Sequence, residues 1–234
     1  MIPNVSILLE IAVDSLSDAV AAERGGADRI ELCSALDRDG LSPSMELFTA
    51  VRAAVRIPVH TMVRVHHRDF CATPDEFAVM QQQIAHFVRG GADGIVLGLL
   101  TAERSIDAQR VQELVRSAHP LPVTFHRAFD AAVDPFTALE EVIRTGAGRL
   151  LTSGQQQNAA EGLPLLRELV RIAGERISIL PGAGIDAGNV ERIVRECGAL
   201  EVHVSRGVKV RDHNEPWRVD ETAVRRLAAH LKTL

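Results

Sequence analysis

The sequence predicts an α/β fold consisting of a single (β/α)8 TIM-type barrel over residues 1–234, because β-rich runs and helical segments alternate along it. A turn containing glycine, followed by a β-rich run, recurs at four places: GGADRIELC from Gly25, GGADGIVLG from Gly90, TGAGRLLTS from Thr145 and CGALEVHVS from Cys197. These starts lie 65, 55 and 52 residues apart, a spacing that suits two β/α units. Four more β-rich runs, at residues 7–13, 57–64, 121–127 and 176–182, alternate with them. Alternation predicts a parallel sheet, and internal repetition favours a closed barrel over the alternative, an open doubly wound sheet.

Helix starts are clearest at three places, where a residue that can cap the first turn precedes a helical pattern. Thr73-Pro74 is followed by Glu76, the pattern of a capping box, and Asp134-Pro135 and Asp107 mark two further starts. Apolar residues at spacings of three and four predict the buried faces of three helices. They are Phe77, Met80, Ile84 and Phe87; Val111, Leu114 and Val115; and Val224, Leu227 and Leu231 in a last helix at about 220–232.

The composition is that of a globular protein, with 46% hydrophobic and 24% charged residues. A net charge of −5 argues against nucleic acid or an anionic membrane surface as a partner. No apolar run reaches the roughly 18 residues of a membrane span, so we expect no membrane insertion. Three cysteines cannot form a disulfide framework, and this low, odd number without a signal peptide predicts a cytoplasmic protein.

Alternation of side chains along the strands predicts an unusual polar set inside the barrel. In LEVHVS (200–205), Leu200, Val202 and Val204 form an apolar face that should pack against helices, which turns the other face towards the lumen. In the other strands the same alternation places apolar residues such as Ile11 and Ile30 on the outward face. The residues expected in the lumen are Glu10, Glu31, Cys33, His60, Met62, Arg64, Thr124, His126, Glu201, His203 and Ser205.

Barrel interiors are usually filled by branched apolar side chains, and an isolated buried charge is costly. These polar groups must therefore be paired, hydrated or bound to a ligand. A purely structural network, with Arg64 neutralising a glutamate, is the alternative for any single residue. For the whole set we expect a functional pocket, since clustered charges shift pKa values as acid–base chemistry requires. The candidate catalytic residues are Glu10, Glu31, His60, Arg64, His126, Arg127, Asp130, Glu201 and His203.

Hydroxyl groups and backbone donors at the ends of the last three barrel strands predict an anion-binding side of this pocket. The run PGAG (181–184) follows the seventh strand, where many barrels bind phosphate, although a tight turn without a ligand would also account for it. The run TSGQ (152–155) offers further donors at the end of the sixth strand. The candidate anion-binding residues are Thr152, Ser153, Gly154, Gln155, Gly182, Gly184 and Ser205.

Some chemistries are excluded or favoured by the residue types present. A Schiff-base lysine in the barrel is excluded, because Lys209 and Lys232 are the two lysines and neither lies in a predicted strand. No GxSxG, GxGxxG or P-loop motif occurs.

Cys33 with Met62 and a histidine would suit Cu(I), whereas Glu and His together would suit Zn(II), Mn(II) or Fe(II). Cys71 would add a thiolate if its loop covered the mouth. The remaining residues of metal-binding type are interpreted as surface histidines (His66 and His67) and a core cysteine (Cys197).

Eight runs resemble the CutC family, whose members are described as copper homeostasis proteins. They are GGADRIELC (25–33), GLSPS (40–44), IPVH (57–60), DFC (69–71), TFHRAFD (124–130), LTSGQ (151–155), GAG (182–184) and LEVH (200–203). The resemblance implies a (β/α) barrel, a cytoplasmic location, a homodimer or homotetramer, and copper handling with Cu(I) as the implied metal. Family members commonly carry a cysteine just after the first-strand Glu-Ile, where this chain has Ala12, so Cys33 is the relevant thiol that remains.

Two functions from different classes follow. The first is a copper homeostasis protein that binds Cu(I) through Cys33, with Met62 or a histidine in support. The second is an enzyme, such as a lyase, isomerase or hydrolase, that acts on a small anionic metabolite. In the second hypothesis the lumen glutamates and histidines supply acid–base groups or ligands for a divalent metal, and Arg64, Arg127 and the GAG turn bind the anion.

Overall fold

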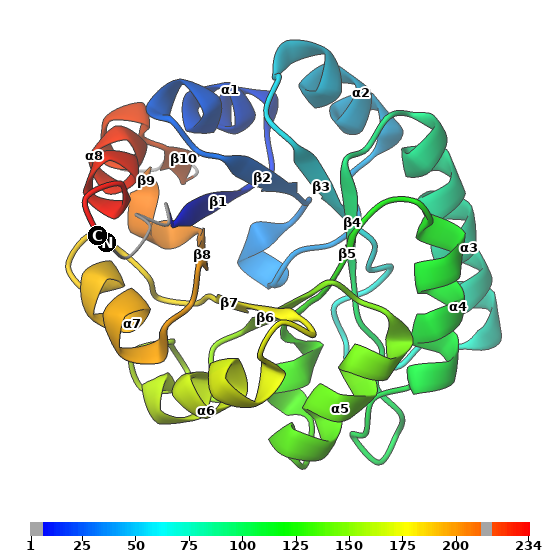
Figure 1. Ribbon diagram of the computed structural model, residues 1–234. Coiled ribbons are helices and arrows are strands. Elements are labelled where there is room, and N and C mark those ends of the chain that lie inside the picture. Colours follow the sequence, from blue (N-terminus) through cyan, green and yellow to red (C-terminus); the bar gives the residue numbers. More distant parts are fainter. Residues whose placement is uncertain (1–6, 212–216) are drawn as a thin grey trace.

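The computed structural model describes residues 7–211 and 217–234, and its centre is a parallel sheet of eight strands (Figure 1). The strands run in the order β7-β6-β5-β4-β3-β2-β1-β8, and the two end strands lie side by side, so the sheet forms an almost closed ring. The predicted barrel is confirmed. The strands are β1 (Leu8–Val13), β2 (Arg29–Leu32), β3 (Val59–Met62), β4 (Gly94–Leu97), β5 (Val123–Phe125), β6 (Arg149–Thr152), β7 (Ser178–Pro181) and β8 (Glu201–Val204).

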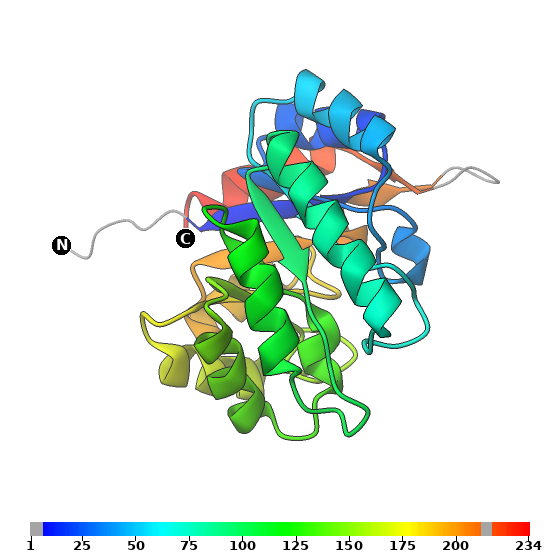
Figure 2. The ribbon, with the colours of Figure 1, turned by 90° about the vertical axis from the view of Figure 1, so that its right-hand side faces the viewer.

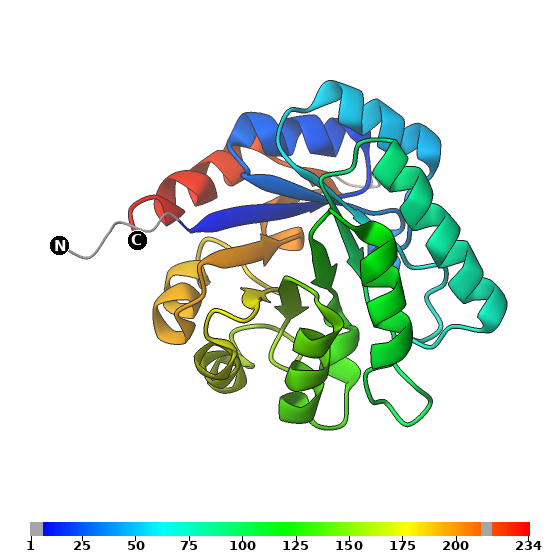
Figure 3. The ribbon, with the colours of Figure 1, turned by 45° about the vertical axis from the view of Figure 1, so that its right-hand side comes forward.

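The helices surround the sheet on its outer face (Figures 1 and 3). In the described part of the chain they are α1 (Leu16–Gly25), α2 (Met45–Ala54), α3 (Pro74–Arg89), α4 (Ala108–Ala118), α5 (Pro135–Thr145), α6 (Leu163–Ala173), α7 (Val190–Cys197) and α8 (Glu221–Leu231). Short 3-10 turns follow three strands: η1 (Leu36–Arg38), η2 (Arg127–Ala131) and η3 (Arg206–Val208). Each turn therefore lies at a carboxyl-terminal strand end, the end at which barrel enzymes place their sites.

The predicted helix starts are confirmed by their capping hydrogen bonds. Thr73 Oγ1 accepts from the Glu76 backbone N–H at 3.2 Å while the Glu76 carboxylate accepts from the Thr73 N–H at 2.8 Å, which completes a capping box. Asp134 caps α5 by accepting from Thr137 N–H at 2.6 Å, and Asp107 caps α4 by accepting from Arg110 N–H at 3.2 Å. These bonds satisfy donors that the first turn of a helix leaves without partners.

The main hydrophobic core fills the layer between the sheet and the helices. Outward strand residues such as Ile11, Ile30 and Val202 are fully buried there, as alternation predicted. Leu200, which the same pattern assigned to this face, is instead 54% exposed. The reason is its position: it precedes the first residue of β8 and lies at the amino-terminal rim, beyond the cover of the helices.

A two-stranded antiparallel hairpin, β9 (Lys209–Val210) with β10 (Arg218–Val219), projects from the carboxyl-terminal side of the barrel (Figure 2). Lys209 was expected to lie outside any strand, yet it belongs to β9. Its ammonium group is buried against Asp14 and Asp18, with distances of 3.4 and 3.2 Å to their carboxylates. Because β9 is not part of the barrel sheet, the exclusion of a Schiff-base lysine in a barrel strand stands.

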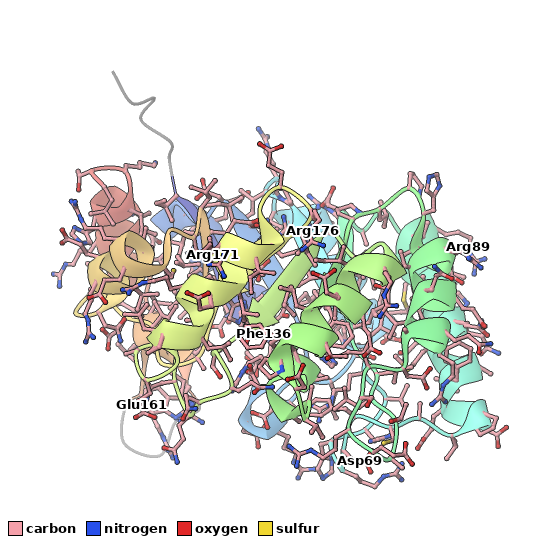
Figure 4. The ribbon with its side chains drawn as sticks, turned by 60° about the horizontal axis from the view of Figure 1, so that its bottom comes forward. Asp69, Arg89, Phe136, Glu161, Arg171 and Arg176 are labelled. Atoms are coloured by element: carbon pink, nitrogen blue, oxygen red, sulfur yellow. The ribbon has the colours of Figure 1, made fainter. Side chains whose placement is uncertain are left out.

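The outer surface of the helices is charged. Arg89 on α3 and Arg171 on α6 project outward (Figure 4), and Arg171 pairs with Glu168 at 2.8 Å. Among the described residues, none of the helices combines the length and the apolar character that crossing a bilayer requires.

Candidate functional site

The structure buries the predicted polar set inside the barrel and divides it into two layers. Glu10, Glu31, His60, His126 and His203 are each less than 8% exposed, and Thr124 is buried with them. Their strands place them at different heights, because Glu10 pairs in register with His203 and with Arg29, whereas Glu31 pairs with Ala12 and His60. One layer lies at the amino-terminal ends of the strands and the other opens at the carboxyl-terminal ends.

The amino-terminal layer is an ion-pair network centred on Glu201. Arg29 and Arg149 each donate to Glu201 Oε2 at 2.7 Å, and Ser178 donates to Oε1 at 2.5 Å. All four residues are the first residue of their strands. Burial alone would raise the pKa of Glu201, but Arg149, Ser178 and Arg29 outweigh it and lower the pKa. Glu201 is therefore a paired structural carboxylate at the closed end of the barrel, remote from the end where catalysis is expected.

Arg29 and Arg149 were not among the predicted residues, although the signal for both was present. Arg29 alternates with Glu31 on the inward face of β2, and Arg149 alternates with Leu151 on β6. Both arginines are the first residue of their strands, a position that we predicted to lie in the lumen for Glu201 but not for them.

Glu10 connects the two layers. Its Oε2 accepts from Arg29 Nε at 2.5 Å, and its Oε1 lies 2.7 Å from Nδ1 of His203. Burial alone would raise the pKa of Glu10, but Arg29 and His203 overcome burial and lower it strongly. An ionised Glu10 fixes the His203 ring so that its second nitrogen, Nε2, faces Glu31, 3.8 Å from Oε2. Burial opposes the charge on His203, but Glu31 and Glu10 outweigh it and raise the pKa of this imidazole.

Glu31 is the least satisfied of the buried carboxylates. Its Oε2 accepts a long hydrogen bond from the Cys33 thiol at 3.5 Å, and its Oε1 has no hydrogen-bond partner among the described residues. Burial raises the pKa of Glu31, with the negative charge of Glu10 adding to the effect and His203 opposing it. A carboxyl group in this position is suited to taking up and releasing a proton.

A cavity of about 570 Å³ opens over Glu31 at the carboxyl-terminal ends of the strands. Its volume lies in the range of small-molecule sites. The predicted residues that line it are Glu31, Arg64, His126, Arg127, Asp130, Gln155, His203 and Ser205, together with Met62. The predicted residues that do not line it are Glu10, His60, Cys33, Thr124, Thr152, Ser153, Gly154, Gly182, Gly184 and Glu201.

Arg64 and His126 face this cavity around the ring of Phe70. The Arg64 guanidinium lies 4.6 Å from the Phe70 ring centre, and the Phe70 and His126 rings are 5.4 Å apart. Arg64 Nη1 donates to the carbonyls of Asp39 and Gly40 at 3.2 and 3.4 Å, whereas its Nε has no partner among the described residues. Burial lowers the pKa of Arg64. Phe70, from the loop after β3, was not predicted as a site residue.

His126 is buried and forms a hydrogen bond with the backbone through one ring nitrogen. Its Nδ1 accepts from the Ala128 N–H at 3.1 Å, and its Nε2 has no partner in the described part of the chain. Burial, reinforced by the positive charge of Arg64, lowers the pKa of His126 to about 3. Burial likewise lowers the pKa of His60 to about 4. Both imidazoles are therefore neutral at physiological pH.

The donors of TSGQ (152–155) are taken up by a carboxylate of the chain itself. Asp130 accepts from Thr152 Oγ1 at 2.5 Å, from Ser153 N–H at 3.1 Å and from Gln155 N–H at 3.2 Å. Gly154 donates its N–H to Thr152 Oγ1. We predicted that these donors bind an external anion, and in the structure they bond to Asp130. Arg127, whose side chain turns over the rim, pairs with Asp130 at 2.8 Å.

The GAG turn after β7 is tightly packed. A Cβ on Gly182 would lie 2.6 Å from Leu151 Cδ1, and one on Gly184 would lie 2.8 Å from Asn158 Cβ. Ala183 and Gly184 both have positive φ, at 73° and 65°. From this turn Ala183 lines the cavity, and Ser205 does so from the end of β8. The close packing accounts for glycine at both positions.

Two groups of side chains are relevant to metal binding. Glu10, Glu31 and His203 each offer a ligand atom, and these atoms lie within 4.8 Å of one another. Both oxygens of Glu10 already have partners, so a metal bound here would compete with Arg29 and with His203 Nδ1 for this carboxylate. The geometry fits a carboxylate that orients a histidine better than it fits three metal ligands.

The second group contains sulfur. Cys33 is completely buried and packs in a small cluster with Met62, Val96 and Leu36. Burial raises the pKa of the Cys33 thiol well above its usual value, and Glu31 raises it further. Cu(I) prefers a thiolate, so this environment opposes the ionisation that binding requires. Ala12, where the family resemblance led us to expect a cysteine, lines the cavity beside Glu31.

The other residues of metal-binding type lie apart from the cavity. Cys71 is half-buried, and its carbonyl oxygen lies 2.9 Å from Nε2 of His66. His67 is exposed, as predicted, but His66 is half-buried rather than a surface residue. Cys197 is buried in α7 within the main core, which confirms its prediction.

Comparisons with known proteins agree with the resemblance noted in the sequence. The CutC family model matches residues 7–208. A copper homeostasis protein cutC homolog from Homo sapiens is 47% identical over 198 residues, covering 85% of this chain and 72% of that protein. A family protein CutC from Xanthomonas campestris is 44% identical over 197 residues, covering 84% of this chain and 82% of that protein.

Solved structures show the same fold. A crystal structure of the putative copper homeostasis protein CutC from Streptococcus agalactiae superposes with a TM-score of 0.80 at 28% identity, covering 84% of this chain and 97% of that chain. A phosphoribosyl anthranilate isomerase from Thermotoga maritima gives a TM-score of 0.63 at 14% identity, covering 97% of this chain and 100% of that chain, which shows the barrel alone. The family match over most of the sequence and the matching barrel lead to one conclusion: this chain belongs to the CutC family.

Proposed function

We propose that the chain is an enzyme that binds a small anionic metabolite in the strand-end cavity and transfers a proton on it. One observation carries the proposal. Glu31, Arg64 and His126 line the same cavity, and each has a buried polar atom without a partner among the described residues. A buried polar atom left unpaired costs about 1–3 kcal/mol, so three of them around one cavity favour a ligand that supplies the missing partners.

Glu31 and His203 are the acid–base groups in this proposal. Both line the cavity, and they face each other across 3.8 Å. Glu10 orients His203 from behind, as a carboxylate orients the histidine of a catalytic triad, and Arg29 balances the charge of Glu10. Two proton-accepting groups side by side allow one to remove a proton while the other returns one.

Arg64 is the cation that attracts the anionic part of the ligand. No carboxylate of the described residues lies within salt-bridge distance of it, whereas Arg127 is neutralised by Asp130. An arginine whose partners are two carbonyls retains an uncompensated charge at the cavity wall.

The test is turnover of metabolites by the purified protein. The protein is incubated with a filtered extract of small cell metabolites, and mass spectrometry records which compounds are consumed or formed. We expect turnover by the parent protein and a rate roughly 10²- to 10⁴-fold lower for Glu31→Gln. Glu161→Gln, on an exposed residue, is the matched control. Equal turnover by Glu31→Gln and the parent, or no turnover at all, rejects the enzyme.

Copper binding is the second candidate function. It is supported by the names of the relatives and by the packing of Cys33 and Met62 in one small buried cluster. A thiol and a thioether in one cluster are ligand types that Cu(I) prefers. An anaerobic Cu(I) titration against a chromogenic chelator tests the assignment. Stoichiometric binding that is lost in Cys33→Ser and kept in Cys197→Ser supports it, and equal binding by Cys33→Ser rejects it.

A further inference from the structure

We infer that the reaction in this cavity is enolisation of a small carbonyl compound that carries an anionic group, with His126 donating a hydrogen bond to the carbonyl oxygen. The inference rests on the proposed function and specifies its reaction and its substrate class. It adds a role for a histidine that takes no part in the Glu10–His203–Glu31 arrangement.

The protonation of His126 follows from its hydrogen bond. The Ala128 backbone N–H donates to Nδ1 at 3.1 Å, and a backbone N–H cannot accept. Nδ1 must therefore carry the lone pair, which places the proton of the neutral imidazole on Nε2. A second proton on Nδ1 would point at the Ala128 N–H, so the charged form is disfavoured by geometry as well as by burial and by Arg64.

Nε2–H is thus a neutral, buried donor without a partner among the described residues, on a histidine that lines the cavity. A neutral imidazole that polarises a carbonyl is an established arrangement in proton-transfer barrels, because it stabilises a developing oxyanion. The His126 ring is fixed by the Phe70 ring on one side and by Gly98 beneath it. Such a donor requires no reorganisation during the reaction.

Arg64 and Glu31 supply the other two groups that the proton transfer needs. Arg64 Nε offers a second unpaired donor, and Glu31 Oε1 offers the unpaired acceptor. In the proposed step Glu31 takes the proton from the carbon next to the carbonyl, and the electron pair of that C–H bond forms a carbon–carbon double bond. The carbonyl π pair moves to oxygen, where His126 and Arg64 stabilise it. Return of the proton to the same carbon regenerates the substrate or its epimer. In a hydroxycarbonyl, the hydroxyl proton of the neighbouring carbon can first pass to the former carbonyl oxygen; return of the C–H proton to the former carbonyl carbon then gives an isomer in which the neighbouring oxygen is the carbonyl.

No oxidant or reductant takes part in this step. The substrate must combine a carbonyl, a C–H bond beside it and a negative charge for Arg64. Phosphorylated hydroxyaldehydes and hydroxyketones meet these requirements, as do 2-keto carboxylates.

Deuterium exchange tests the reaction. Dihydroxyacetone phosphate, glycolaldehyde phosphate, hydroxypyruvate and any metabolite consumed in the extract experiment are incubated with the protein in D₂O, and NMR follows the proton beside the carbonyl. We expect exchange with at least one of them, slowed at least 100-fold by Glu31→Gln and by His126→Leu. His126→Gln, which keeps a donor, should exchange faster than His126→Leu. His67→Gln, on an exposed residue, is the control.

Nitrogen NMR of histidine-labelled protein tests the role of His126 without any substrate. We expect its resonances, assigned from the His126→Leu spectrum, to show a proton on Nε2 and no titration between pH 5 and 8. A proton on Nδ1, or titration near the usual histidine pKa, overturns the role of His126. Consumption of a metabolite without deuterium incorporation overturns enolisation while the proposed enzyme stands. Absence of both turnover and exchange rejects both.

Discussion

The imidazole of His126 lies directly over Gly98, so closely that a Cβ on this glycine would be 2.6 Å from Nδ1 and 2.7 Å from Cε1. The same relationship recurs four residues earlier, where a Cβ on Gly94 would be 2.5 Å from the His60 ring. Gly94 in β4 and Gly98 directly after it therefore make room for two imidazoles, that of His60 in β3 and that of His126 directly after β5. Space in the lumen, rather than backbone flexibility, accounts for both glycines.

Gly98→Ala should displace the His126 ring and break its hydrogen bond with Ala128. Inserting a methyl group into this packed position should destabilise the protein by about 1–3 kcal/mol. The amide resonance of Ala128 should shift, and metabolite turnover should fall to the level of His126→Leu. Gly148→Ala is the matched control, because a Cβ there meets nothing within 4 Å. An unchanged Ala128 resonance in Gly98→Ala would contradict the tight fit.

Arg64→Met should separate function from stability. Arg64 is buried with two carbonyls as its partners, so its removal should change the free energy of unfolding by less than about 1 kcal/mol or should stabilise the protein. Inorganic phosphate should raise the melting temperature of the parent, because a ligand that binds the folded state stabilises it. Arg64→Met should lose that response, and Arg38→Met, on an exposed residue, should keep it. An equal phosphate response in Arg64→Met would exclude Arg64 as the anion site.

Asp130→Asn should loosen the loop after β6. The carboxylate accepts from two backbone N–H groups and two hydroxyls, and an amide nitrogen in its place would face one of these donors. We expect a loss of about 2–3 kcal/mol in urea unfolding and faster amide exchange at Ser153 and Gln155. Asp37→Asn, on an exposed residue, should show neither change. Unaltered exchange at Ser153 would show that Asp130 does not hold this loop.

Much of this site could be predicted from alternation alone. A strand with one apolar face must bury that face under helices, so the inward position of Glu10, Glu31 and His203 followed without knowledge of any contact. Alternation does not give depth along the barrel. Glu201 satisfies the same rule as His203, yet two residues of separation place it in the ion-pair layer at the opposite end.

Partners distant in the sequence were beyond prediction for a different reason. The donors of TSGQ look identical whether an external anion or an internal carboxylate binds them. Asp130 lies more than 20 residues away, and the turn η2 that brings it to Ser153 depends on tertiary packing. The same limit applies to Cys33, whose residue type suggests a metal ligand while its burial beside Glu31 keeps it protonated.

Glu201→Gln should reduce stability and its pH dependence together, because the folded protein lowers the pKa of this carboxyl through Arg149, Ser178 and Arg29 against the effect of burial. A lowered folded pKa contributes stability above the unfolded value of about 4.3, and this contribution is lost as the pH falls through the folded pKa. At pH 7 the variant should lose about 3 kcal/mol, since Arg149 keeps a buried charge without its carboxylate. Urea unfolding between pH 7 and 3 should show a shallower decline below pH 4.3 for Glu201→Gln than for the parent or for Glu161→Gln. Parallel declines in all three proteins would mean that Glu201 is not ionised in the folded barrel.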